Sequence, residues 1–344
     1  MSVRRLTLQA LLAVCMMPAA LAEEPAPLPQ PKPAAGVHVD KPIETPLPQP
    51  ATTAPLPSAE AVNPDRFGGK PEDAAFGAYQ RGLYKTAYDL ALARAKNGDP
   101  AAETLVAEIL SRGLGVPLDQ AEAAKWYALA AEQSVPEAQF QYALMLLDGK
   151  YVKKDEKEAY ALMQAAAEAG NKLAQFNFAQ MLVQQDPGDA GFAKAVPYYE
   201  RAAETGLADA QYAMAQIYAN GIGGKPHDDS QARTLLTNAA RQNYDTAQLD
   251  LAAWMIEGRG GARDLKGGFG WMKRAAEGGN VAAQNRLAKL YMGGIGTDPD
   301  LVLAGAWYIV ARRAGLIDPK MDDFLQGLDD DQTKQALQRA NRLP

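Results

Sequence analysis

The chain has 344 residues, 47% of them hydrophobic, which is enough for two ordinary domains or one long repeat array. Its net charge of −6 argues against nucleic acid and anionic membranes as partners, because both bind basic surfaces. The only cysteine is Cys15, so a disulfide within one chain is excluded.

Residues 1–22 are predicted to be a secretory signal peptide. Arg4 and Arg5 precede a short apolar run, and Ala20-Leu21-Ala22 is a small-x-small cleavage site. We expect a mature, periplasmic chain that begins near Glu23 and carries 33 basic and 41 acidic side chains, a net charge of −8. This mature chain has no cysteine and therefore no thiolate nucleophile or cysteine metal ligand.

Two alternatives to a soluble secreted chain stay open. A membrane anchor is disfavoured because the apolar run is shorter than a membrane span needs, and no later segment reaches that length. A lipoprotein processed at Cys15 is disfavoured because Val14 is a poor residue before a lipidated cysteine.

Residues 23–66 are predicted to be a proline-rich tether. Twelve prolines lie between Pro25 and Pro64, and no Phe, Trp or Tyr lies among them. Proline fixes φ and removes hydrogen-bond donors, so the segment favours polyproline II and cannot bury a core. We expect a spacer, and a docking motif for a proline-reading partner is the alternative.

A period of 36 or 37 residues dominates the rest of the chain. A glutamine returns at Gln139, Gln175, Gln211, Gln248 and Gln284, and Glu103 occupies the same position one period earlier. A fixed period of this length is typical of stacked helical repeats. The predicted fold is therefore an all-α, right-handed solenoid of helix–loop–helix units.

The predicted units follow one another without gaps. Residues 67–99 form a degenerate first repeat, with a short helix, a turn near Gly82 and a second helix. Residues 317–344 form capping helices. The six full repeats between them are 100–135, 136–171, 172–207, 208–244, 245–280 and 281–316.

Each unit resembles a Sel1-like repeat, a relative of the tetratricopeptide repeat with a longer, glycine-bearing loop. The closest segments are QYAMAQIYANGIG at 211–223 and QNRLAKLYMGGIG at 284–296. Three units depart from the pattern: 184–189 reads QQDPGD, Lys150-Tyr151 follows Gly149, and one extra residue lies near Pro226. The resemblance implies an adaptor without cofactor, of a kind that often serves envelope signalling or assembly in secreted bacterial members.

The sequence offers no catalytic residue and no metal site. It contains no HExxH, GxSxG or SxxK motif, and its glycine loops do not match the phosphate-binding GxxxxGK[ST] pattern. His227, Asp228 and Asp229 form a weak metal constellation, for which a solvated loop with Asp229 or Ser230 capping the next helix is the preferred interpretation.

A stripe along the first helices is the candidate partner-binding groove. In each unit, three positions spaced i, i+3, i+7 depart from the repeat consensus and share one helix face. With Trp254 as an added aromatic anchor, the candidates are Gln141, Asn177, Gln180, Gln216, Asn220, Asp250, Trp254, Glu257, Arg286 and Lys289.

Two further expectations concern packing. Ala215 is predicted to fill a small-residue core position and Ala213 an exposed one on the same helix. Trp126, Trp271 and Trp307 share one repeat position and are predicted to pack in the core.

The favoured function is a periplasmic adaptor that binds an envelope protein or peptide. Because the middle of the stripe is rich in amides, a protein that binds peptidoglycan or another polysaccharide is the alternative. An enzyme acting on β-lactams or the cell wall is the lesser one.

Overall fold

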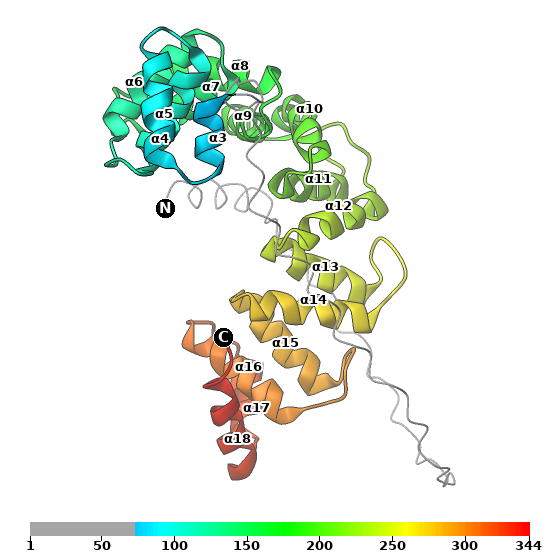
Figure 1. Ribbon diagram of the computed structural model, residues 1–344. Coiled ribbons are helices and arrows are strands. Elements are labelled where there is room, and N and C mark those ends of the chain that lie inside the picture. Colours follow the sequence, from blue (N-terminus) through cyan, green and yellow to red (C-terminus); the bar gives the residue numbers. More distant parts are fainter. Residues whose placement is uncertain (1–72) are drawn as a thin grey trace, which may run out of the picture. The chain divides into compact units, whose positions relative to one another are not determined.

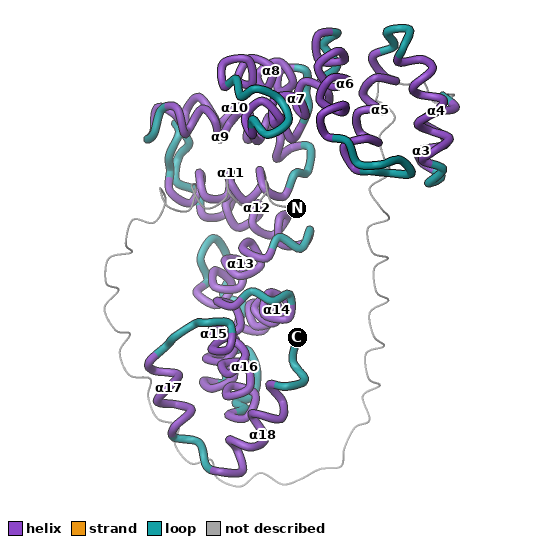
Figure 2. The backbone as a smooth tube through the Cα atoms, turned by 90° about the vertical axis from the view of Figure 1, so that its left-hand side faces the viewer, coloured by secondary structure: helices purple, strands orange, loops and turns teal. Residues whose placement is uncertain are grey.

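The computed structural model describes residues 73–344, so the predicted signal peptide and tether lie outside the described residues. Every element among residues 73–344 is a helix, and no strand occurs there (Figure 2). The predicted all-α solenoid is confirmed. None of these helices combines the length with the apolar character that a membrane-spanning helix needs.

Each full repeat contributes an A helix and a B helix, and successive helices pack on one another along the chain (Figure 1). The A helices are α5 (Pro100–Arg112), α7 (Pro136–Asp148), α9 (Lys172–Gln185), α11 (Ala208–Asn220), α13 (Asp245–Glu257) and α15 (Val281–Gly293). The B helices are α6 (Gln120–Glu132), α8 (Glu156–Glu168), α10 (Asp189–Glu204), α12 (Asp229–Arg241), α14 (Leu265–Glu277) and α16 (Leu301–Arg313).

Short helices flank the repeats at both ends. Before them come α3 (Ala74–Gln80) and α4 (Tyr84–Ala95), joined at Gly82, whose φ of +75° suits a glycine. After the repeats come α17 (Pro319–Gln326) and α18 (Asp330–Ala340), and α18 packs on α16. Gly305 of α16 permits this approach, because a Cβ there would lie 3.1 Å from the Cβ of Ala336.

A small-residue position in each A helix allows the helices to pack closely. Ala215 is 1% exposed, and its counterparts in the other repeats are fully buried: Ala107, Ala143, Ala179, Ala252 and Ala288. Because only alanine occurs there, the backbones of neighbouring helices can approach. The predicted core role of Ala215 is confirmed.

The repeated glutamine ties each A helix to the preceding B helix. In five repeats its Nε2 donates a hydrogen bond to a backbone carbonyl eight residues earlier, at 3.0–3.4 Å. That carbonyl belongs to the last turn of the B helix, where carbonyls lack partners within the helix. The 36-residue glutamine period therefore marks a side-chain cap between helices.

The loops between A and B helices are held by glycine and aspartate. A glycine with positive φ ends most A helices, as Gly221 does at +62°. A later loop glycine packs on the preceding repeat: a Cβ at Gly260 would lie 2.1 Å from the carbonyl oxygen of Asp229. Asp228 then caps α12 by accepting from the backbone N–H of Gln231 at 2.9 Å, so the predicted caps Asp229 and Ser230 were wrong by one or two residues.

The unit with the sequence QQDPGD keeps its period by lengthening its helices. Helix α9 has 14 residues and α10 has 16, while the other A and B helices have 13 each. Part of the loop is thus replaced by about one extra turn of helix, divided between α9 and α10, and the stack continues through this repeat.

Candidate functional site

The stripe predicted from sequence is only partly accessible. Asn220, Glu257 and Arg286 are exposed, whereas Gln180 and Trp254 are only 3% and 8% exposed. The remaining five side chains are half-buried: Gln141, Asn177, Gln216, Asp250 and Lys289.

Trp254 is a core residue rather than an exposed anchor. It occupies an apolar A-helix position that holds Ile217 one repeat earlier and Leu290 one repeat later. The guanidinium of Arg259 lies 3.9 Å from its ring centroid and covers it. The other tryptophans behave as predicted, with Trp307 buried and Trp126 and Trp271 half-buried against the core.

Ala213 was predicted to be exposed, and this is wrong. It is 4% exposed and belongs to the core cluster that includes Phe176, Ala179 and Met214. The error arises because Ala213 packs into a core cluster to which α9 and α10 also contribute side chains. A leucine at either Ala213 or Ala215 would therefore overpack a helix contact.

The amide side chains of the stripe already donate hydrogen bonds inside the chain. Gln141 donates to Glu137 at 2.9 Å, and Asn177 donates to the carbonyl of Leu173 at 2.7 Å. Asn220 donates to the carbonyl of Gln216 at 2.8 Å. These amides stabilise their own helices, so fewer of their N–H groups are available to a ligand.

Asp250 is the most elaborately positioned residue of the stripe. Its Oδ2 accepts a hydrogen bond from the hydroxyl of Tyr212 at 2.9 Å and a longer one from Nε2 of Gln216 at 3.4 Å. Both donors lie on α11, one repeat earlier. Burial raises the pKa of the Asp250 carboxyl above its ordinary value, and these two donors and the positive charges of Arg286 and Arg259 act in the opposite direction.

Tyr212 was missed from sequence because tyrosine at its position reads as part of the apolar helix face. Its ring lies 5.1 Å from that of Tyr244, at an angle of 32°. The hydroxyl of Tyr244 is buried and has no hydrogen-bond partner among the described residues. The signal that could have found Tyr212 is its spacing of one helical turn from Gln216.

Asp318 is contacted by two residues of α15, Asn285 and Lys289, which are one helical turn apart. Asn285 donates to its Oδ2 at 2.9 Å, and Nζ of Lys289 lies 2.5 Å from the same oxygen. Asn285 and Lys289 correspond to Tyr212 and Gln216 in the repeat. The contact with Lys289 lowers the pKa of the Asp318 carboxyl.

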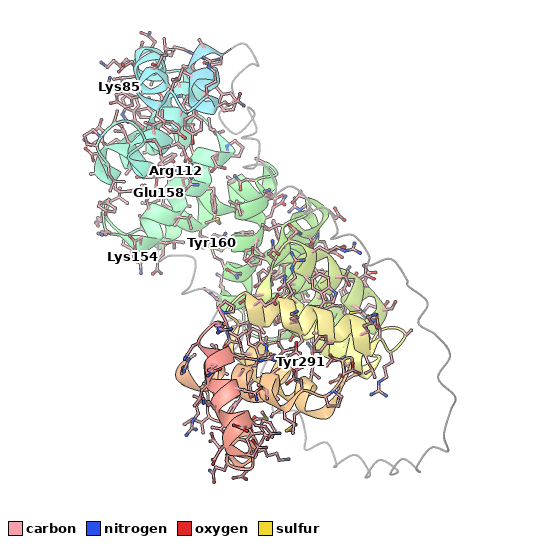
Figure 3. The ribbon with its side chains drawn as sticks, turned by 60° about the horizontal axis from the view of Figure 1, so that its bottom comes forward. Lys85, Arg112, Lys154, Glu158, Tyr160 and Tyr291 are labelled. Atoms are coloured by element: carbon pink, nitrogen blue, oxygen red, sulfur yellow. The ribbon has the colours of Figure 1, made fainter. Side chains whose placement is uncertain are left out.

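At the other end of the array, Glu108 occupies the position that corresponds to Gln216. Its carboxylate accepts from Arg112 at 2.8 Å and from the hydroxyl of Tyr127 at 3.1 Å. Arg112 also donates to the hydroxyl of Tyr79 at 3.2 Å and lies at the end of α5 (Figure 3). This acid is buried and paired, so it contributes to packing of the first repeats.

The loop of His227 does not gather a metal-binding set. Nε2 of His227 lies 3.3 Å from Oδ1 of Asp229, but that carboxylate is paired with Arg259 at 2.7 Å. Asp228 is used as the helix cap. No group of three His, Cys, Asp or Glu side chains suited to a metal ion occurs in the described part of the chain.

The repeated part of the chain matches a known family of repeats. The Sel1 repeat model matches residues 100–135, 136–171, 173–207, 208–244, 246–280 and 281–316. No curated protein matches the chain.

Solved structures show the same fold. A Sel1 repeat protein from Oxalobacter formigenes is 26% identical, with a TM-score of 0.60 over 71% of this chain and 97% of that one. A protective antigen present in uropathogenic Escherichia coli strains, displaying an SLR fold, is 27% identical, with a TM-score of 0.52 over 75% of this chain and 63% of that one. With six matching repeats, the chain belongs to the Sel1 repeat family.

Proposed function

We propose that this protein is a periplasmic adaptor that binds an envelope protein or peptide along the stripe of its A helices. A Sel1 repeat scaffold is suited to protein–protein interaction, because stacked helix pairs present one extended surface. The role in envelope signalling or maintenance and the export to the periplasm are parts of the proposal. Export is supported by the sequence of residues 1–22.

The observation that carries the proposal is the charged, partner-free end of the stripe. Glu257 and Arg286 are exposed and form no ion pair within residues 73–344, whereas Arg259 and Lys289 on the same stretch of chain are paired. Asp250 also lacks an ion pair there, and it is held in place by Tyr212 and Gln216. Ordered or exposed charges without internal partners are what an interaction surface supplies.

The polysaccharide alternative loses its main support. It relied on free amides, and Gln141, Asn177 and Gln216 donate within the chain, while Gln180 is buried.

The proposal is tested by cross-linking the native protein in the periplasm and identifying what is captured. We expect one envelope protein to be captured by the wild-type chain and lost when Glu257 and Arg286 are both changed to alanine. A parallel pull-down with cell-wall sacculi should capture little. Capture by sacculi alone, or capture that survives the double change but needs residues 23–66, would overturn the assignment of the stripe.

A further inference from the structure

Two acids in this protein are held by the same pair of A-helix positions. Tyr212 and Gln216 on α11 hold Asp250, and Asn285 and Lys289 on α15 hold Asp318. In both cases the acid lies on the element that follows in the stack. The Asp318 arrangement can therefore be compared directly with the Asp250 arrangement.

The two arrangements differ in the charge of the residues that contact the acid. Asp318 receives a full positive charge from Lys289 at 2.5 Å, and its carboxyl pKa is lowered accordingly. Asp250 accepts hydrogen bonds only from neutral donors and forms no direct ion pair with any described residue, while Arg286 and Arg259 act on it without contact. Its carboxyl pKa is raised by burial instead. A partly buried carboxylate is unfavourable when ionised unless a cation contacts it, so a cation that reaches Asp250 directly adds to the weaker, longer-range effect of Arg286 and Arg259.

One oxygen of Asp250 is available for such a cation. Both internal hydrogen bonds go to Oδ2, and Oδ1 accepts none within residues 73–344. Oδ1 is also not among the fully buried polar atoms that lack a partner, so it retains contact with solvent. The carboxylate is thus oriented by α11 through Oδ2, while Oδ1 retains contact with solvent.

We propose that Asp250 is a subsite for a lysine or arginine side chain of the protein partner, with Tyr212 and Gln216 as positioning residues. This inference rests on the proposed function, because it names the chemistry of the partner that the stripe binds. A divalent metal ion is a poorer occupant, since no second or third acidic or histidine ligand lies beside Asp250 in the described part of the chain.

The surrounding charges favour a particular order in the partner. Glu257 lies two helical turns further along the same face of α13 and is exposed, while Arg286 on α15 is exposed and unpaired. A segment that crosses from α13 to α15 is complementary if it carries a basic residue over Asp250 and an acidic residue towards Arg286. Arg286 then also discourages a second basic residue at its own position.

The experiment uses random-sequence peptides displayed on phage and selected on the full chain, followed by binding measurements by fluorescence polarisation. The enriched peptides should share one lysine or arginine. Asp250→Asn should weaken binding of an enriched lysine peptide about tenfold, and acetylation of that lysine should weaken binding to the wild type by the same factor. Both changes together should cost no more than either one alone.

Asp245→Asn is the matched control, because it removes the same charge by the same substitution at an exposed position of the same helix that lies outside the stripe. It should change the affinity by less than about twofold. A carbodiimide cross-link between Asp250 of the wild-type chain and the peptide lysine, located by mass spectrometry, gives a second readout that does not depend on a folded variant.

The outcomes separate this inference from the proposed function. If peptides are enriched that share no basic residue, or that bind Asp250→Asn as tightly as the wild type, the subsite is overturned and the adaptor function stands. If no peptide is enriched and no envelope protein is cross-linked, both are overturned.

Discussion

Two neighbouring contacts between A helices use the same three repeat positions with different residues. Between α11 and α13 these are Tyr212, Gln216 and Asp250, which form a hydrogen-bonded set. Between α9 and α11 they are occupied by Phe176, Gln180 and Ala213. Here no acceptor replaces the carboxylate, and Nε2 of Gln180 is buried without a partner.

This difference shows that a single side chain decides whether such a contact is hydrogen-bonded or apolar, while the packing of the helices is retained. A buried amide without a partner costs about 1–3 kcal/mol, and the stack accepts that cost at Gln180. At the next contact a single carboxylate satisfies its two donors and presents charge to solvent. A repeat scaffold can therefore alter its surface one position at a time.

The largest effect is expected from placing an aspartate at position 213, which corresponds to Asp250 one repeat earlier. Ala213→Asp should lower the free energy of unfolding by about 1–3 kcal/mol, because a carboxyl would be buried beside Phe176, which has no donor. Adding Phe176→Tyr should recover about 1 kcal/mol by restoring the missing hydroxyl. Urea unfolding followed by circular dichroism measures both, and a double variant no more stable than the single one would contradict the equivalence of the two contacts.

The hydroxyl of Tyr212 provides the next test. Tyr212→Phe should lower the free energy of unfolding by about 1–2 kcal/mol, since Asp250 would keep only the longer hydrogen bond from Gln216. Tyr244→Phe is the control, because its hydroxyl is buried without a partner and its removal should cost nothing. Equal losses in the two variants would show that the hydrogen bond to Asp250 adds no stability.

A gain in stability is expected at the first full repeat. Glu103 occupies the repeated glutamine position but has no N–H to donate to the preceding helix, and burial raises the pKa of its carboxyl. Glu103→Gln should add about 0.5–1.5 kcal/mol at neutral pH. Gln211 shows that the geometry is possible, since it donates to Ala203 while accepting from Gln242 at 2.8 Å. A melting temperature that stays the same or falls would refute the capping role of this position.

The smallest effect is a pH dependence of opposite sign at the two held acids. The pKa of Asp250 is raised by folding, so its contribution to stability is lost as pH rises above the ordinary aspartate value of about 4. The pKa of Asp318 is lowered, so its contribution is present above about pH 4 and lost as pH falls below it. The stability difference from wild type should therefore shrink with rising pH for Asp250→Asn and grow for Asp318→Asn. Urea midpoints from pH 3 to 7 measure this, and parallel slopes would contradict it.

The sequence by itself determined the architecture. Its period, its loop glycines and its alanine positions are local or repeating features, so they predicted paired helices and the core role of Ala215 before any contact was known. The turn at Gly82 was also readable, because a positive φ depends on a few adjacent residues.

The tertiary structure alone decided which positions of the stripe reach solvent. Equivalent positions in a repeat share a helix face, but their exposure depends on the side chains of the neighbouring helix, which the period does not specify. Ala213 and Trp254 are therefore buried although the pattern predicted accessible residues. Tyr212 donates a hydrogen bond to Asp250, and Lys289 forms an ion pair with Asp318. The partners are about one repeat apart in the sequence, so only the packing of successive helices brings them together.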